Sequence, residues 1–147
     1  KKALKGAIDL GIAMQLTNIA RDVIEDKKRG RKYIDSDFSY IKETIKEAEI
    51  FYQKSFNSIS EIPIRSRFSV IVARRVYKKI GDYILKEKNI ENYSKAGKIY
   101  VPIVGKIIET IFSIGDFFKL IFAKDINYTH DDYHSAIKEK INLDERI

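Results

Sequence analysis

The sequence lacks cysteine altogether and has only two histidines, His130 and His134. The absence of cysteine excludes a disulfide framework, a thiolate metal site and a catalytic thiol. Two histidines are too few for a multi-histidine zinc site, and two prolines with seven glycines do not provide the turns of an all-β sandwich. No apolar run reaches the ~18 uncharged residues of a membrane span. We therefore expect a cytoplasmic globular protein, without a secretory leader, that contacts at most the inner face of a membrane.

The charge of the chain is strongly positive: 28 Lys and Arg oppose 21 Asp and Glu, a formal net charge of +7. Lysine supplies 20 of the positive charges, and isoleucine occurs 26 times. Such a composition is typical of a biased genome as well as of a binding surface. Whatever part of the positive charge is not due to genome composition favours an anionic ligand, such as a diphosphate, nucleic acid or an acidic membrane surface.

Hydrophobic periodicity predicts an all-α chain. Helices are expected over residues 2–28, 38–60, 64–88 and 100–123, with a polar connection at 89–97. The second stretch is the clearest, with apolar positions three, four or seven residues apart at Ile41, Ile45, Ala48, Tyr52 and Ile59. We expect one helical domain over residues 1–123 and a polar tail over 124–147. Because the first helix starts at once, without a capping residue, the sequence is expected to be a fragment of a longer chain.

Polar side chains gather on one face of the first predicted helix. At about 100° per residue, the residues that share this face are Gln15, Asn18, Asp22, Glu25 and Asp26. Apolar residues cover the adjoining faces so broadly that the acidic face is expected to point into a cavity. For an isolated pair of aspartates at this spacing, a solvated helix surface remains the alternative interpretation.

Two carboxylates one helical turn apart repel each other, and a cation relieves the repulsion. Hard oxygen ligands of this kind suit Mg²⁺, or Mn²⁺ in its place, which takes one or two carboxylates and fills its other positions with water and phosphate oxygens. Basic residues surround these carboxylates in the sequence, among them Arg21 and Arg31. Metal on one side and guanidinium groups on the other are what a diphosphate requires.

The string around these residues is more specific than the spacing alone. Residues 10–26 read LGIAMQLTNIARDVIED, and residues 30–33 read GRKY. Together they resemble the second aspartate-rich motif of the squalene/phytoene synthase family. Residues 73–80, ARRVYKKI, resemble a later helix of that family, and residues 98–102, KIYVP, its C-terminal basic motif. The resemblance extends over about residues 3 to 110 and is closest to phytoene synthase.

The resemblance implies a helical bundle of the isoprenoid synthase type around a central cavity, in which two prenyl diphosphates condense head to head through a cyclopropyl intermediate. Asp22 and Asp26 would bind Mg²⁺, with Asn18 assisting and Glu25 as an indirect ligand. The substrate-binding residues would be Gln15, Arg21, Arg31, Tyr33 and Lys98. Tyr77 would contact the substrate or the intermediate from a facing helix, although a core tyrosine is the alternative at that position.

Two departures from the family pattern matter. The first aspartate-rich motif is absent from this sequence, so we expect the chain to need the N-terminal half of the same protein for catalysis. Lys98 stands where the family commonly has arginine, which replaces a guanidinium fork by a point charge.

Several alternatives stay open at this point. The substrate is expected to be geranylgeranyl diphosphate, giving phytoene, with farnesyl diphosphate, giving squalene or dehydrosqualene, as the second choice. A non-catalytic helical partner protein of the same ancestry is the contrasting function, whereas a nucleic-acid binder would leave the acidic face unexplained. The apolar segment 107–123 is interpreted either as core or as an interfacial patch. His130 and His134 are interpreted as part of a solvated tail.

Overall fold

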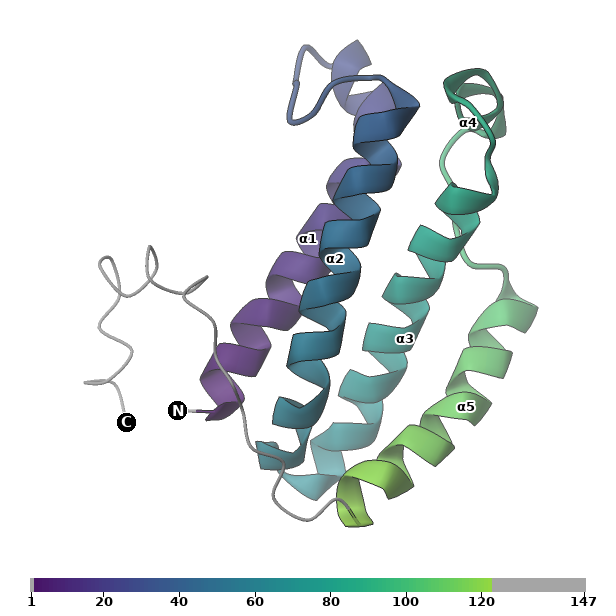
Figure 1. Ribbon diagram of the computed structural model, residues 1–147. Coiled ribbons are helices and arrows are strands. Elements are labelled where there is room, and N and C mark those ends of the chain that lie inside the picture. Colours follow the sequence, from purple (N-terminus) through teal and green to yellow (C-terminus); the bar gives the residue numbers. More distant parts are fainter. Residues whose placement is uncertain (1, 123–147) are drawn as a thin grey trace, which may run out of the picture.

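The computed structural model describes residues 2–122, and in this range the chain is a bundle of helices (Figure 1). The helices are α1 (Lys2–Lys28), α2 (Phe38–Ser58), η1 (Ile59–Glu61, a 3-10 turn), α3 (Ile64–Lys86), α4 (Ile90–Ala96) and α5 (Ile103–Phe122). The described residues contain no strand. The all-α prediction is therefore confirmed, while the expected tail 124–147, with its two histidines, lies outside the described residues.

The predicted helices are present with small differences at their ends. The first spans the expected residues, the second passes into η1 at Ile59, and the last begins at Ile103. Pro102 explains this late start, because a proline disfavours helical geometry in the residue before it. Its carbonyl accepts the first bond of the new helix, from the Lys106 amide at 3.0 Å.

The segment 89–97 was expected to be a polar connection, and this expectation is wrong for its central part. Residues 90–96 form α4, which the Asn89 side chain caps by accepting a hydrogen bond from the Asn92 amide at 2.9 Å. Gly97 ends the helix with a φ of 67°. A capping asparagine and a terminal glycine were the available signals, but one short helix has no periodicity to support them.

Successive long helices run in alternating directions, and α3 lies between the α1–α2 pair and α5 (Figure 1). The side chains that fill the main core come from α1, α2, α3, α4 and the segment before α5: Ala20, Val23, Phe38, Ile41, Ile45, Ile80, Ile84, Tyr93, Ile99 and Val101. A second cluster between α1 and α2 contains Ala13, Ala48, Phe51 and Tyr52. All five apolar residues predicted for the second helix and its end are buried.

Buried polar groups tie the helices together. Arg74 on α3 donates from Nε and Nη2 to the Tyr52 carbonyl of α2, at 3.0 and 2.7 Å. The Tyr52 hydroxyl shares a hydrogen bond of 3.0 Å with Thr17 of α1, and burial raises its pKa to about 12. These contacts hold α1 in a defined position, which matters because α1 carries the acidic residues.

Candidate active site

The C-terminal half of α1 carries the predicted site. The apolar side of this helix is buried in the core, and this packing determines the direction in which its polar side chains point. Ala13, Ala20 and Val23 are buried in the core. The helix ends where Gly30 takes a φ of 72°, a conformation that glycine adopts without a Cβ clash. The Arg31 amide then donates to the Asp26 carbonyl at 2.8 Å, so the chain turns back beside the last carboxylate.

Asp22 is held in a two-point ion pair by its neighbour on the chain. Nε and Nη2 of Arg21 donate to Oδ1 and Oδ2 of Asp22 at 2.9 and 2.8 Å, and Nζ of Lys98 lies 3.4 Å from Oδ1. Partial burial opposes ionisation of Asp22, but the hydrogen bonds and charge of Arg21, with that of Lys98, outweigh it and lower the pKa of the carboxyl. The group is therefore a carboxylate at neutral pH.

Lys98 also reaches Glu25, so it joins two acids on successive turns of α1. Its Nζ donates to Oε2 of Glu25 at 3.1 Å, and Arg29 pairs with Oε1 at 2.6 Å. The hydrogen bond from Lys98 is the main cause of the lowered pKa of Glu25, followed by the charge of Arg29. The predicted basic residue at position 98 thus lies beside the acidic motif, although 73 residues separate it from Glu25 in sequence.

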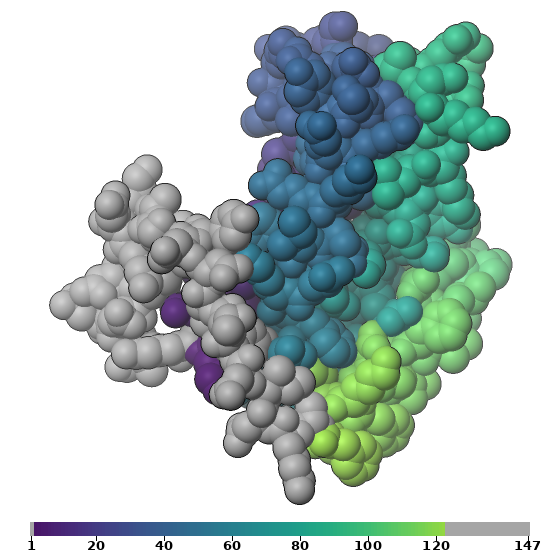
Figure 2. Space-filling model, viewed as in Figure 1, coloured from purple at the N-terminus to yellow at the C-terminus, as the bar shows by residue number. Residues whose placement is uncertain are grey.

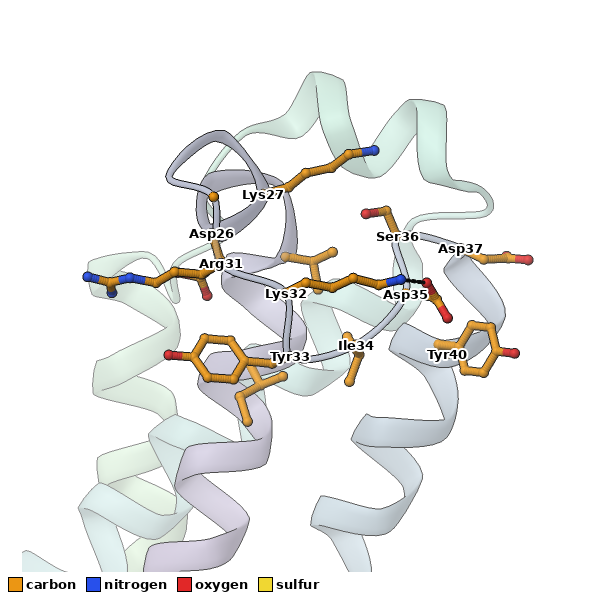
Figure 3. A pocket seen from close by; sticks show the side chains of 13 residues that line it. Asp26, Lys27, Arg31, Lys32, Tyr33, Ile34, Asp35, Ser36, Asp37 and Tyr40 are labelled. Carbon is orange, nitrogen blue, oxygen red and sulfur yellow. Dashed lines mark ion pairs between the residues drawn. The ribbon is translucent and has the colours of Figure 1, made fainter.

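Asp26 faces a different space, a pocket of about 530 Å³ between the end of α1, the following loop and the start of α2. Among residues 2–122 its carboxylate has no ion-pair partner. Arg31 and Tyr33, both predicted to bind substrate, line the same pocket, and their side chains extend to one side of the loop (Figure 3). Lys32 points the other way and pairs with Asp35. A carboxylate, a guanidinium and a phenol therefore share one opening.

Asn18 carries the one polar atom of the predicted metal set that is both buried and unpaired. Its Oδ1 is shielded from solvent and has no hydrogen-bond partner. A buried carbonyl oxygen without a partner is costly, and a cation would satisfy it. In the described part of the chain, however, no three carboxylate or imidazole groups converge on one point. Asn18, Asp22 and Asp26 are oxygen ligands of the kind that Mg²⁺ prefers, and that ion fills its other positions with water and phosphate oxygens.

The remaining predicted residues occupy different surroundings. Gln15 is exposed on α1. Tyr77 on α3 is partly buried and packs against both core clusters, on the side of α1 and α2. The expected single acidic face is thus divided: Asp26 lines the large pocket, whereas Arg21, Glu25 and Lys98 line a second pocket of about 230 Å³.

Tyr93 was missed by the sequence analysis and has a central place in the site. Its hydroxyl donates to the backbone carbonyls of Ala20 and Arg21, at 2.8 and 2.5 Å. These bonds fasten α4 to α1 directly before Asp22 and so position the chain that leads to Lys98. No sequence signal could reveal this contact, because α4 is short and the two partners are more than 70 residues apart.

The part of the chain that carries this candidate site is similar to known proteins. Residues 1–38, which contain the acidic motif and the basic loop, match the family described as squalene/phytoene synthase. A 15-cis-phytoene synthase of Paracoccus is 35% identical over 101 residues, covering 56% of this chain and 33% of the relative. Over these residues the chain is similar to the squalene/phytoene synthase family. A chloroplastic phytoene synthase of an Oncidium hybrid cultivar shares 32% identity over 130 residues, covering 74% of this chain and 31% of the relative.

The fraction of each relative that the match covers is as informative as the percentage of identical residues. The chain spans about a third of the length of the curated relatives it matches, including 32% of the 15-cis-phytoene synthase of Pantoea ananas, with which it shares 31% identity. No solved structure matches the chain. The similarity to this family therefore rests on sequence alone.

Proposed function

We propose that this chain forms part of a Mg²⁺-dependent prenyltransferase that condenses two geranylgeranyl diphosphates head to head into phytoene. Two C20 diphosphates would join through a cyclopropyl diphosphate, with loss of both diphosphates and of two protons, one on closure of the cyclopropane ring and one in the final elimination. The observation that carries the proposal is the α1 motif: the unpaired Asn18 oxygen and the carboxylates of Asp22 and Asp26 lie on a helix bordered by cations. The relatives named phytoene synthase support the choice of substrate.

The metal would be held by Asp26 and Asp22, with Asn18 supplying a neutral oxygen. When bound, Mg²⁺ would neutralise the diphosphate and assist its departure. Asp26 is available directly, whereas Asp22 must first exchange part of its pairing with Arg21 and Lys98. The cations released from Asp22 would then be free to bind diphosphate oxygens, so the same exchange prepares both the metal ligand and the anion site.

The loop after α1 would bind the leaving diphosphate from the other side. Arg31 offers a planar fork that matches phosphate oxygens, and Tyr33 offers a hydroxyl on the same side of the loop. Tyr77 would face the hydrocarbon part of the substrate from α3. An apolar surrounding keeps water from the carbocation, which water would otherwise trap as an alcohol.

The proposal is tested by product analysis. The 147-residue chain and the product of its whole reading frame are incubated with Mg²⁺ and either geranylgeranyl or farnesyl diphosphate, and the extracted hydrocarbons are identified by mass. We expect a C40 hydrocarbon from the whole product, and none from the 147-residue chain alone, since half of the expected aspartate-rich set is absent from it. A C30 product instead would assign a farnesyl-diphosphate enzyme.

Metal binding is measured separately, with Mn²⁺ as a paramagnetic probe and inorganic diphosphate present. Asp26→Asn is expected to weaken Mn²⁺ binding at least about tenfold, while Asp82→Asn, an exposed acid on α3, should leave it unchanged. Equal binding by the Asp26 variant and the unsubstituted protein would contradict the metal assignment. Absence of any hydrocarbon from either substrate would favour the non-catalytic helical partner instead.

A further inference from the structure

Lys98 is a cation that joins two acids of α1 from outside that helix. Its Nζ lies 3.4 Å from Oδ1 of Asp22 and donates to Oε2 of Glu25 at 3.1 Å. A single ammonium group therefore bridges two carboxylates that are one helical turn apart. Two neighbouring negative charges make this position favourable for any cation, and here a side chain of the protein itself fills it.

The segment that carries Lys98 is anchored to α1. The hydroxyl of Tyr93, a residue of α4 that is 2% exposed, donates to the carbonyls of Ala20 and Arg21 at 2.8 and 2.5 Å. Gly97 then ends α4 with a φ of 67°, directly before Lys98. Figure 2 shows α4, in teal green at the upper right, on the surface of the molecule. Lys98 thus reaches the two acids from a short surface segment whose position depends on Tyr93.

An anion can approach Lys98 through the smaller pocket of the site. This pocket of about 230 Å³ lies between α1 and α4, and its charged lining residues are three cations, Arg21, Lys28 and Lys98, and one acid, Glu25. The side chains of Lys98 and Glu25 are 36% and 37% exposed, so their ion pair is open to solvent. A tetrahedral oxyanion in this pocket would offer Arg21 and Lys98 a partner of higher charge than a carboxylate.

Metal binding and anion binding are therefore linked through the same cations. Asp22 can bind a divalent ion only if positive charge moves away from it, because Arg21 and Lys98 repel that ion while they stay in place. An oxyanion that draws these cations toward itself leaves Asp22 available as a ligand. Linkage is reciprocal, so a metal ion on Asp22 raises the affinity for the oxyanion by the same factor.

We propose that Lys98 is an internal competitor of the metal ion: it occupies Asp22 until an oxyanion binds, so that the site takes up metal and anion together. This inference rests on the proposed function, from which it takes the metal ligands, and it adds the order in which they become available. Asp26 lines the other pocket and is open from the start. Asp22 becomes a ligand only when a phosphate group of the substrate has taken over Lys98.

The competition is measured without substrate and without turnover. Mn²⁺ is titrated with the 147-residue chain in sodium chloride, and the free ion is followed by its electron paramagnetic resonance signal. Lys98→Met is expected to strengthen Mn²⁺ binding about fivefold, because the competing charge is gone. Lys98→Arg keeps that charge and should bind Mn²⁺ within about twofold of the unsubstituted chain. Lys95→Met removes an exposed lysine of α4 that pairs with Glu91, and this matched control should change nothing.

The coupling is measured with sulfate, a tetrahedral oxyanion that itself binds Mn²⁺ only weakly. Replacing chloride by sulfate at equal ionic strength should strengthen Mn²⁺ binding by the unsubstituted chain about threefold and have little effect on Lys98→Met. Tyr93→Phe removes the bonds that anchor α4, and it should strengthen Mn²⁺ binding in chloride by less than Lys98→Met does. A protein-free titration corrects for ion pairs of Mn²⁺ with sulfate, and circular dichroism verifies that each variant retains its helices.

The outcomes distinguish a failure of this inference from a failure of the proposed function. If Lys98→Met binds Mn²⁺ no more tightly than the unsubstituted chain, while Asp26→Asn binds it more weakly, Lys98 does not compete and only the inference is wrong. Equal strengthening in Lys95→Met, which would reflect net charge alone, or an undiminished sulfate effect in Lys98→Met also overturns it. If no variant binds Mn²⁺ in either salt, the metal assignment of the proposed function is wrong, and the inference is wrong with it.

Discussion

At the scale of single residues, the two aspartates of the α1 motif differ in what surrounds them. Asp22 is 19% exposed and bound by Arg21, whereas Asp26 opens on the larger pocket. Sequence spacing places them one turn apart on the helix but says nothing of this difference. It arises because Lys98, far along the chain, reaches Asp22 and Glu25 but not Asp26.

The pairing of Asp22 predicts how stability depends on pH. Because the folded protein lowers the pKa of this carboxyl, its contribution is complete above the ordinary aspartate pKa of about 4 and is lost as pH falls through the lower, folded-state value. We expect the free energy of unfolding of Asp22→Asn to be lower than that of the unsubstituted chain by about 1 kcal/mol at pH 6.

This difference should shrink toward zero at about pH 2.5. The measurement is urea unfolding followed by circular dichroism at both pH values. Glu61→Gln, at an exposed acid in the turn after α2, serves as the control and should change neither value. A deficit of the Asp22 variant that is the same at both pH values would show that the ion pair is not its cause.

The residues of the site also differ in how far sequence could predict them. The motif string alone identifies Asn18, Asp22 and Asp26 as a set, because helical periodicity relates residues within one element. That the Asn18 oxygen is buried without a partner, and that Gln15 is exposed, depends on what packs against α1. The role of Tyr93 depends on a contact between distant segments and has no local signal.

At the scale of elements, α1 packs so closely on the end of α2 that one position tolerates no side chain. A Cβ on Gly6 would lie 2.0 Å from that of Ser58, whereas one on Gly11 would meet nothing within 4 Å. Both glycines lie inside the same helix, where alanine is intrinsically preferred by up to about 1 kcal/mol. Alanine substitution at each of the two glycines therefore distinguishes the effect of packing from that of helix propensity.

We expect Gly6→Ala to lower the free energy of unfolding by about 2 kcal/mol or more, since the two helices must move apart. Gly11→Ala should raise it by about 0.5–1 kcal/mol. Urea unfolding of both variants at neutral pH provides the measurement. Equal effects of the two substitutions would contradict the close contact between α1 and the end of α2.

At the scale of the whole molecule, both ion pairs and apolar contacts attach α5 to the rest of the bundle. Arg75 binds both acids of α5, and its guanidinium lies 5.4 Å from the centre of the Phe112 ring. An apolar contribution comes from Leu120, which packs with Ile59 and Ile71. Lys79 also lies 3.6 Å from Glu109, and Lys119 lies 3.6 Å from Asp116. Removal of Arg75 therefore leaves each buried acid with only one, longer ion pair.

Arg75→Met is therefore expected to lower the free energy of unfolding by about 2 kcal/mol. Adding Glu109→Gln and Asp116→Asn to this variant should restore at least half of the loss, because no buried charge then remains. Arg65→Met, at an exposed arginine of α3, is the control and should have little effect. If the triple variant is no more stable than Arg75→Met, Arg75 stabilises the contact between α3 and α5 through packing rather than through its charge.

The sequence by itself determined the long helices, their apolar stripes and the motif of α1, because all of these depend on residues within a few turns of one another. It also indicated the family, since the motif string is local. The tertiary structure alone decided which cations neutralise Asp22 and Glu25, that α4 is fastened to α1 through Tyr93, and that α5 turns its acids inward. Periodicity identifies the apolar side of a helix, but only its neighbours determine whether that side lies in the core or on the surface.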